Sequence, residues 1–313
     1  MTPMAVVACF LLLLLPPCGA RLVRPTAEQL AWQDLEMGAL VQYNIGLFGE
    51  LSNNYACANG VLPPEAFAPA TPVDTDAWAG AARSFGAKYA LLTVQAGCGF
   101  LLYPTNTSVR NGTRYPYTTR AAPSPTSEAP DIVKRFVDSC RAAGIRPGLY
   151  YQVANNVFCN VTAGKVNGGK GAVGPCGNQT QYEELAVAQL RELWGSAGYG
   201  ALSELWFDGG VNSGKDPTPA SLAARISALI AQLQPAAVAF QAPYVASVGG
   251  SRSLVRWAGT ESGITAVDTW STARDAVDYG AGEADGGLGA VMWGPVECGE
   301  LHPASSLSLV KSS

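Results

Sequence analysis

A carboxylate stands at the end of a short apolar run and is followed by two glycines. Leu205 to Phe207 leads directly into Asp208, and Gly209 and Gly210 come next. Apolar residues of this kind form a buried strand, while glycines permit a sharp turn and the close approach of a ligand. A carboxylate placed this way can attack carbon, and the matching chemistry is hydrolysis of a glycoside with retention. That reaction needs a second carboxyl group about 5–5.5 Å away.

Two glutamates are candidates for the second carboxyl group. Glu261 follows an apolar segment and lies among small residues in the stretch 256–263. Glu297, within 294–298, is the reserve candidate. Each of these acids, Asp208 included, could instead cap a helix or pair with an arginine. The flanking aromatic and glycine residues favour a catalytic role for Asp208, and the strand-end position favours one for Glu261.

Strand-like and helical segments alternate along the chain. Apolar runs predict strands at 39–45, 89–94, 147–151, 202–207, 237–241, 254–257 and 290–293. Helical periodicity predicts helices at 76–85, 131–143, 182–197 and 222–233. Repeated strand–helix units indicate parallel strands with crossover helices. An α/β fold follows, either a closed (β/α)8 TIM-like barrel or an open doubly wound sheet. The barrel is favoured because no glycine-rich phosphate loop opens a helix.

Polar residues follow the predicted strands in turn. They are Asn44, Gln95, Gln152, Asp208, Gln241 and Glu261. In a barrel all of these converge on the carboxyl-terminal face, where active sites lie. Long loops at 53–72, 104–130 and 155–179 follow the first three strands and are expected to rim the same face.

Composition limits the classes of function. The chain has 313 residues, of which 48% are hydrophobic and 14% charged, and its net charge is -4. There is no basic stripe, so nucleic-acid binding is not expected. A neutral polar substrate fits this balance better.

The amino-terminal segment predicts secretion. Residues 1–20 are typical of a cleaved signal peptide, because the apolar run 5–15 is too short to span a bilayer. No other segment is expected to cross a membrane. Four N-x-Ser/Thr sequons agree with secretion and predict glycosylation at Asn106, Asn111, Asn160 and Asn178. Residues 21–303 are then predicted to form the catalytic barrel.

Cysteine usage also suits an oxidising compartment. Removal of the signal leaves an even number of cysteines, at positions 57, 98, 140, 159, 176 and 298. Cys159 and Cys176 flank a glycine-rich loop and are the best disulfide candidates. Cys140 lies on the apolar face of a predicted helix and is a candidate buried thiol.

Several motifs together resemble a known family. They are Gln29–Gln33, Asp74–Trp78, Lys88–Thr93, Pro147–Tyr151, the Asp208 motif and Arg256–Gly263. With these motifs the sequence resembles the α-L-fucosidases of glycoside hydrolase family 29, of the plant and bacterial type, from about Arg24 to Pro303. The resemblance implies that Asp208 is the nucleophile and Glu261 the acid/base. It also implies a fucosylated glycan as substrate, no metal or organic cofactor, and a barrel followed by a β-sandwich.

The sequence departs from the family pattern at the sugar-binding positions. The family usually has histidines just after strands one and two, whereas this chain has Gln42, Asn44 and Gln95 in those segments. These side chains can still donate and accept hydrogen bonds, but they carry no charge. The only histidine is His302. After Pro303 the expected last barrel unit and β-sandwich are absent, so the barrel is predicted to be incomplete and residues 304–313 to be an unstructured tail.

Aromatic residues are candidates for stacking on a sugar. Trp206 precedes Asp208, and Trp293 ends a predicted barrel strand. The leading hypothesis is a secreted α-L-fucosidase, located outside the cell or in a wall, vacuole or lysosome. The alternatives are a catalytically weak or inactive glycan-binding protein, which the missing histidines motivate, and a glycosidase for another sugar.

Overall fold

The computed structural model describes a large part of the chain. It covers residues 24–49, 57, 60–123, 130–169, 171–195, 198–211, 220–243, 245–257, 272–274, 291–293, 295–300 and 307–312. The predicted signal peptide and Glu261 lie outside the described residues.

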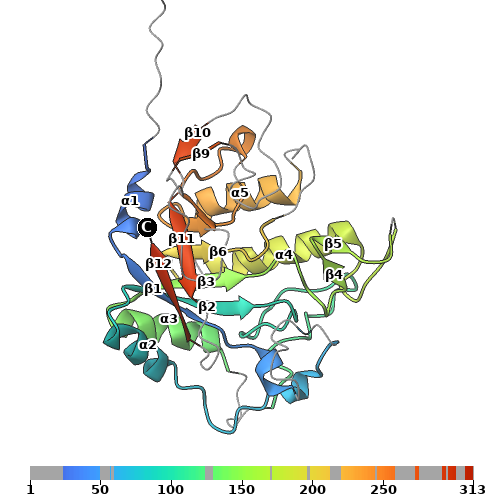
Figure 1. Cartoon of the computed structure of the whole chain (residues 1–313). Helices are drawn as coiled ribbons and strands as arrows, with labels where there is room; N and C mark the ends of the chain where they lie inside the picture. The colour runs from blue at the N-terminus through green and yellow to red at the C-terminus, as the bar shows by residue number, and fades with distance from the viewer. Residues whose placement is uncertain are drawn as a thin grey trace, which may run out of the picture.

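Eight strands form a closed barrel (Figure 1). Around the barrel their order is β1-β12-β11-β8-β7-β6-β3-β2. Their bounds are β1 Met37–Val41, β2 Tyr89–Gln95, β3 Arg146–Tyr151, β6 Glu204–Trp206, β7 Val238–Phe240, β8 Leu254–Trp257, β11 Val296–Glu300 and β12 Leu307–Ser312. Neighbouring strands are parallel, except that β12 runs antiparallel to both β1 and β11. The predicted α/β barrel is confirmed, with an irregular carboxyl-terminal part.

Two sequence predictions about that carboxyl-terminal part are wrong. The segment predicted as a barrel strand at 290–293 is β10 (Val291–Trp293), which pairs with β9 (Thr272–Arg274) in a separate sheet. A short apolar run indicates a strand but not its partner. The predicted tail at 304–313 contains β12, whose alternating apolar and polar residues suit a strand and whose backbone pairs with the edge of β1.

Five α-helices are present in the described part of the chain. They are α1 Ala27–Gln33, α2 Thr75–Ser84, α3 Ile132–Ala142, α4 Gln179–Trp194 and α5 Leu222–Leu233. The last four lie within a few residues of their predicted positions, and a side-chain oxygen caps each of them at Asp74, Asp131, Asn178 and Ser221. Short 3-10 turns occur at Ile45–Phe48, Pro64–Ala66 and Ala246–Val248. None of the helices in these described ranges is long and apolar enough to cross a membrane.

Strand alternation separates two cores. The larger core lies between the strands and the helices; every predicted apolar position of α3 is buried in it. The smaller core fills the barrel and is formed by Trp32, Leu40, Tyr89, Leu91, Ala96, Tyr150, Val238, Phe240 and Val255. Trp32 enters it from α1. A Cβ on Gly38 would come within 2.3 Å of the Tyr89 ring, so glycine at this position makes room for the phenol.

Disulfides brace the loops that follow the strands. Cys159 and Cys176 are bonded, as predicted, around the hairpin of β4 (Val161–Thr162) and β5 (Lys165–Val166). A second disulfide, which the sequence did not predict, joins Cys57 to Cys98. Cys140 is a buried free thiol.

Candidate active site

Asp208 lies immediately beyond the carboxyl end of β6, in the turn expected from its glycines. Gly209 has φ 70° and Gly210 has φ 69°, values that L residues with a side chain rarely adopt. A Cβ on Gly209 would also stand 3.3 Å from the Cβ of Ala154. The two glycines therefore let the chain reverse here and leave Asp208 half-buried at the barrel mouth.

Two side chains from β3 and its extension hold one oxygen of Asp208. Tyr150 Oη donates to Oδ2 over 2.6 Å, and Gln152 Nε2 donates to the same oxygen over 3.2 Å. The backbone N–H of Gln152 in turn donates to Gln95 Oε1 over 3.0 Å. Three predicted strand-end residues, Gln95, Gln152 and Asp208, thus form one hydrogen-bonded chain. No described residue donates a hydrogen bond to Oδ1 of Asp208.

A stack of three rings lies beside Asp208. The Trp206 ring is nearly parallel to that of Phe240, with ring centroids 4.0 Å apart, and it stacks on Tyr150 from the other side with centroids 5.1 Å apart. Trp206 is half-buried, so part of its indole remains accessible. An indole in this position can support the apolar face of a sugar ring.

The predicted sugar-binding amides differ in their surroundings. Asn44 is buried and its Oδ1 accepts the N–H of Gly46 over 2.7 Å, so it caps the 3-10 turn that follows β1. Gln95 is 1% exposed, and its Nε2 has no hydrogen-bond partner among the described residues. Gln42 is half-buried beyond the end of β1. Nε2 of Gln95 is therefore a buried donor without a described partner, whereas Oδ1 of Asn44 is engaged in the local turn.

Gln241 follows β7 in an unusual backbone conformation. Its φ is +50°, which is uncommon for a residue with a long side chain, and it is largely buried. Strained residues of this kind concentrate at functional sites. Gln241 directly follows Phe240, the outer ring of the stack, so it belongs to the same strand-end cluster as Asp208.

Two buried glutamates accept hydrogen bonds from indole groups. Glu297, the reserve acid/base candidate, is 2% exposed, and its Oε2 accepts the indole N–H of Trp206 over 3.0 Å. Sequence reasoning missed Glu204, which is fully buried and accepts the indole N–H of Trp32. The signal was available, because residues 204, 206 and 208 share one face of a strand. Burial raises the pKa of Glu204 to about 7, against hydrogen bonds from Glu297 and Trp32 that lower it.

Other predicted residues are placed as follows. Glu261 lies outside the described residues. Trp293 belongs to β10, which is not a barrel strand, so the reason for expecting it at the barrel mouth is removed. The four sequon residues, Asn106, Asn111, Asn160 and Asn178, are all exposed. Within the described ranges, no cluster of His, Cys, Asp and Glu side chains could hold a metal ion.

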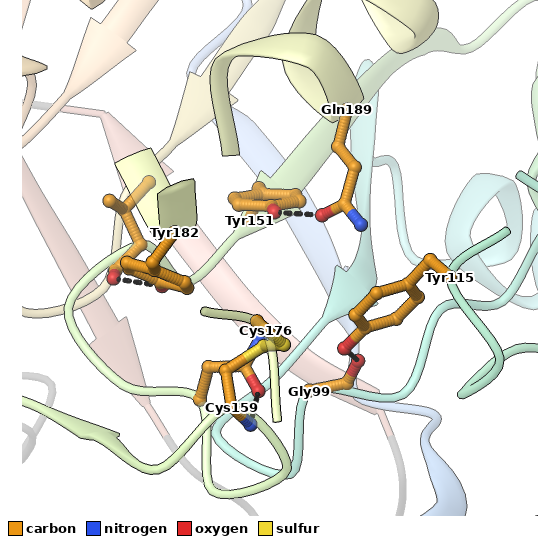
Figure 2. The surroundings of a disulfide bond; sticks show 9 residues. Gly99, Tyr115, Tyr151, Cys159, Cys176, Tyr182 and Gln189 are labelled. Carbon is orange, nitrogen blue, oxygen red and sulfur yellow. Dashed lines mark hydrogen bonds between the residues drawn. A yellow bond between two sulfur atoms is a disulfide. The ribbon is translucent and has the colours of Figure 1, made fainter. Parts of the chain in front are cut away.

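A disulfide and several hydrogen bonds hold the loops that follow β2 and β3. In Figure 2 the Cys159–Cys176 disulfide lies near three tyrosines with bonded hydroxyls. Tyr115 donates to the carbonyl of Gly99 and Tyr182 to that of Val153, each over 2.7 Å. Tyr151 donates to Gln189 from α4. The first bond lies within the loop after β2, and the other two join α4 to β3 and to the residues that follow it.

Comparisons with known proteins bear on the family and the fold. The family model described as Alpha-L-fucosidase matches residues 28–248. A curated relative from Oryza sativa subsp. japonica, named "Putative alpha-L-fucosidase 1", is 29% identical over 82% of this chain, which spans 42% of that relative's length. A crystal structure named as a putative alpha-L-fucosidase from Bacteroides thetaiotaomicron has a TM-score of 0.66 and 25% identity, covering 88% of this chain and 60% of that one.

A third likeness is to a GH29 fucosidase from Ruminococcus gnavus, solved in complex with fucose. It has a TM-score of 0.59 and 20% identity and covers 87% of this chain and 54% of its own, a likeness that shows the shared fold. The family model alone extends over more than half of the sequence. The chain belongs to the alpha-L-fucosidase family of glycoside hydrolases.

Proposed function

We propose that this protein is a secreted α-L-fucosidase that removes terminal α-L-fucosyl residues from glycans with retention of configuration. The observation that carries the proposal is the geometry of Asp208 at the barrel mouth. Tyr150 and Gln152 fix its Oδ2, while Oδ1 receives no hydrogen bond from a described residue. A carboxylate oriented in this way is suited to attack an anomeric carbon.

The reaction proceeds in two displacements. Oδ1 of Asp208 attacks the anomeric carbon as the glycosidic C–O bond breaks, and Glu261 gives its proton to the leaving oxygen. Glu261, now ionised, then takes a proton from water, whose oxygen attacks the anomeric carbon and releases Asp208. One carboxyl group must be protonated while the other is ionised, so the activity is expected to be highest at mildly acidic pH.

The substrate contacts follow from the same strand ends. Trp206 provides the apolar surface beneath the sugar ring, and its stacking on Phe240 and Tyr150 holds it in place. Gln95 Nε2 and Gln42 supply hydrogen-bond donors for sugar hydroxyls, in the region where the family usually has histidines. Because these amides are neutral at every pH, sugar binding itself should vary little with pH.

Hydrolysis of a chromogenic aryl α-L-fucoside by the purified glycosylated protein tests the proposal. Asp208→Ala should lower kcat by roughly a thousandfold or more, since the nucleophile is removed. Asp34→Asn, an exposed acid at the end of α1, is the matched control and should leave the rate unchanged. NMR of the first-formed sugar should show the α-anomer, and a β-anomer would exclude a retaining mechanism.

Two other outcomes would identify the alternative functions. A folded protein that binds fucose without hydrolysing any fucoside would be a glycan-binding protein, and Asp208→Asn would then leave its affinity nearly intact. Hydrolysis of a different glycoside from a panel of aryl sugars would replace the proposed substrate. Either result would overturn the fucosidase assignment.

Secretion and glycosylation form part of the same proposal. All four sequon asparagines are exposed, and both disulfides require an oxidising compartment. Expression of the full sequence in a secreting cell should yield protein in the medium or in an acidic vesicular compartment. Its mass should fall on enzymatic removal of N-glycans, and retention of an unglycosylated protein in the cytosol would contradict this part.

A further inference from the structure

A polar cleft of about 630 Å³ lies beside helix α3 and shares no residue with the site around Asp208. Its walls come from α3, from the end of α4 and from the segments 103–106 and 198–200. The charged side chains that line it are three basic and three acidic, namely Arg120, Lys134 and Arg141, and Asp131, Asp138 and Glu192. Because the charges balance, the cleft favours a neutral polar ligand over a simple anion or cation.

The lining also offers an aromatic ring next to hydrogen-bonding groups. Tyr199 is half-buried in the cleft wall, and its hydroxyl donates to Asp131 Oδ2 over 3.0 Å. Its ring meets that of the buried Tyr103 edge to face, with centroids 6.2 Å apart. A fixed ring among carboxylates, a lysine and an arginine is the kind of surface that binds a sugar, which has both apolar C–H groups and hydroxyls.

Asn106, the first residue of a glycosylation sequon, lies at the rim of this cleft. It is exposed, and its backbone N–H donates to Glu192 Oε1 over 2.8 Å. Its Oδ1 accepts from Arg120 Nη2 over 3.5 Å, and the same Nη2 donates to the carbonyl of Pro104 over 2.6 Å. Residues that line the cleft therefore hold both the backbone and the side chain of Asn106.

The atom to which an N-linked glycan is attached is available. Nδ2 of Asn106 makes no hydrogen bond to a described residue. Arg120 likewise uses only Nη2 in its bonds to described residues, so its Nε and Nη1 remain as donors. A sugar attached to Asn106 would thus begin at the rim of a cavity that already contains donors and acceptors for its hydroxyls.

We propose that this cleft binds the first N-acetylglucosamine units of a glycan attached to Asn106. These sugars are neutral and carry hydroxyl and amide groups, which match the balanced charges of the lining. Attachment to the chain gives them a high effective concentration at the cleft, so weak contacts suffice to hold them there. The inference rests on the glycosylation part of the proposed function and is independent of fucoside hydrolysis.

Asn111 provides an internal control five positions further along the chain. It lies within 110–114, where every residue is exposed, and it is not among the residues that line the cleft. Its Oδ1 accepts the backbone N–H of Thr113 over 3.1 Å, which closes a short local turn. A glycan on Asn111 should therefore extend into solvent.

Release of each glycan by a peptide N-glycanase tests the proposal. Glycopeptide mass spectrometry of the secreted protein gives the release rate at each site, in the native protein and after heat denaturation with reductant. Native release at Asn106 should be about tenfold slower than release from the denatured protein, the factor that one or two net hydrogen bonds supply. Release at Asn111 should differ little between the two states. An unoccupied Asn106, or equal protection at the two sites, would overturn the inference.

A pair of variants separates binding in the cleft from mere crowding by nearby protein. Lys134 and Asp138 are 64% and 56% exposed and pair with each other on α3, so Lys134→Ala/Asp138→Ala should change stability little. This double variant removes a donor and an acceptor from the cleft and should speed native release at Asn106. Lys165→Ala/Glu65→Ala removes one exposed charge of each sign outside the cleft and should leave the wild-type rate. Protection that persists unchanged in the cleft variant would refute binding.

The two proposals can fail separately. If the aryl fucoside is not hydrolysed, the release rates still decide whether the cleft holds the glycan. If hydrolysis is found and the Asn106 glycan is unprotected, the proposed activity stands and the inference about the cleft is wrong.

Discussion

Replacing Trp32 by phenylalanine should destabilise the barrel through one hydrogen bond. Trp32 is 2% exposed, lies in α1 outside the strands, and donates its indole N–H to Glu204 over 2.9 Å. Phenylalanine keeps an aromatic ring against Tyr89 but removes the donor, which leaves a buried carboxyl oxygen unsatisfied. Such a loss costs about 1–3 kcal/mol. The smaller ring adds roughly 1 kcal/mol for lost packing. The free energy of unfolding should therefore fall by about 2–4 kcal/mol.

Trp78→Phe provides the matched control. Trp78 is half-buried on α2, packs on the ring of Tyr43 with centroids 5.0 Å apart, and makes no indole hydrogen bond to a described residue. This variant should lose only the packing part, roughly 1 kcal/mol.

Urea unfolding, followed by circular dichroism at a pH near 5, measures both variants. The change in the urea midpoint should be two to four times larger for Trp32→Phe at an unchanged slope, a ratio that is roughly the quotient of the two estimates. Equal losses for the two variants would refute the reasoning, because they would show that the indole N–H contributes nothing to stability. In a Glu204→Gln background the cost of Trp32→Phe should be smaller, since a neutral acceptor is cheaper to leave unpaired.

Two further predictions concern pH and the loop disulfide. The pKa of Glu204 is raised from the ordinary glutamate value of 4.5 to about 7. Between these two pH values the folded protein keeps a proton that the unfolded chain releases. The stability that this provides is complete below pH 4.5 and is lost as the pH rises through about 7. Urea unfolding should show a fall of about 3 kcal/mol between pH 4.5 and 8 that Glu204→Gln abolishes, and identical pH dependence in that variant would contradict it. Replacing Cys57 and Cys98 by serine opens a loop of 41 residues and should cost about 4 kcal/mol, measured by chemical unfolding without reductant, while a loss below about 1 kcal/mol would contradict the chain-entropy argument.

Local patterns predicted the elements that carry a clear hydrophobic period. The apolar positions of α3, from Ile132 to Cys140, are all buried, and β8 has the predicted bounds 254–257. Asp208 could be placed because its signal is local: an apolar run, an acid and two glycines. The same is true of the Cys159–Cys176 disulfide, whose partners flank one loop.

Long-range pairings were the main failures. Six cysteines allow fifteen pairings, so nothing in the sequence singled out Cys57 with Cys98. The run at 290–293 reads as a strand in isolation, and only the assembled fold shows that 296–300 enters the barrel instead. Helix α1 was missed because a helix of seven residues is too short to show a clear hydrophobic period. The capping box formed by Thr26 and Gln29 nevertheless marks its start.

The buried glutamates show a different limit. Glu204 precedes an apolar run, and because charged residues are rarely buried, the sequence predicts that Glu204 is exposed to solvent at the start of the strand. Its burial depends on a partner ninety-three positions later and on an indole from α1, which are brought together only by closure of the barrel. Pattern reasoning assigns faces to strands, but it does not tell which inward carboxyl groups will meet.

The antiparallel closing strand has a consequence for biosynthesis. β1 pairs with β12, so that Gly38 lies opposite Val310, and translation must reach β12 before this seam can form. Throughout that interval the nascent chain exposes the free edge of β1, a surface that other strands can join. Vectorial folding on the ribosome can therefore build the β1–β2–β3–β6 side first, but the ring closes only after β12 has emerged. Expression hosts with ample chaperone capacity should give the best yield of folded protein.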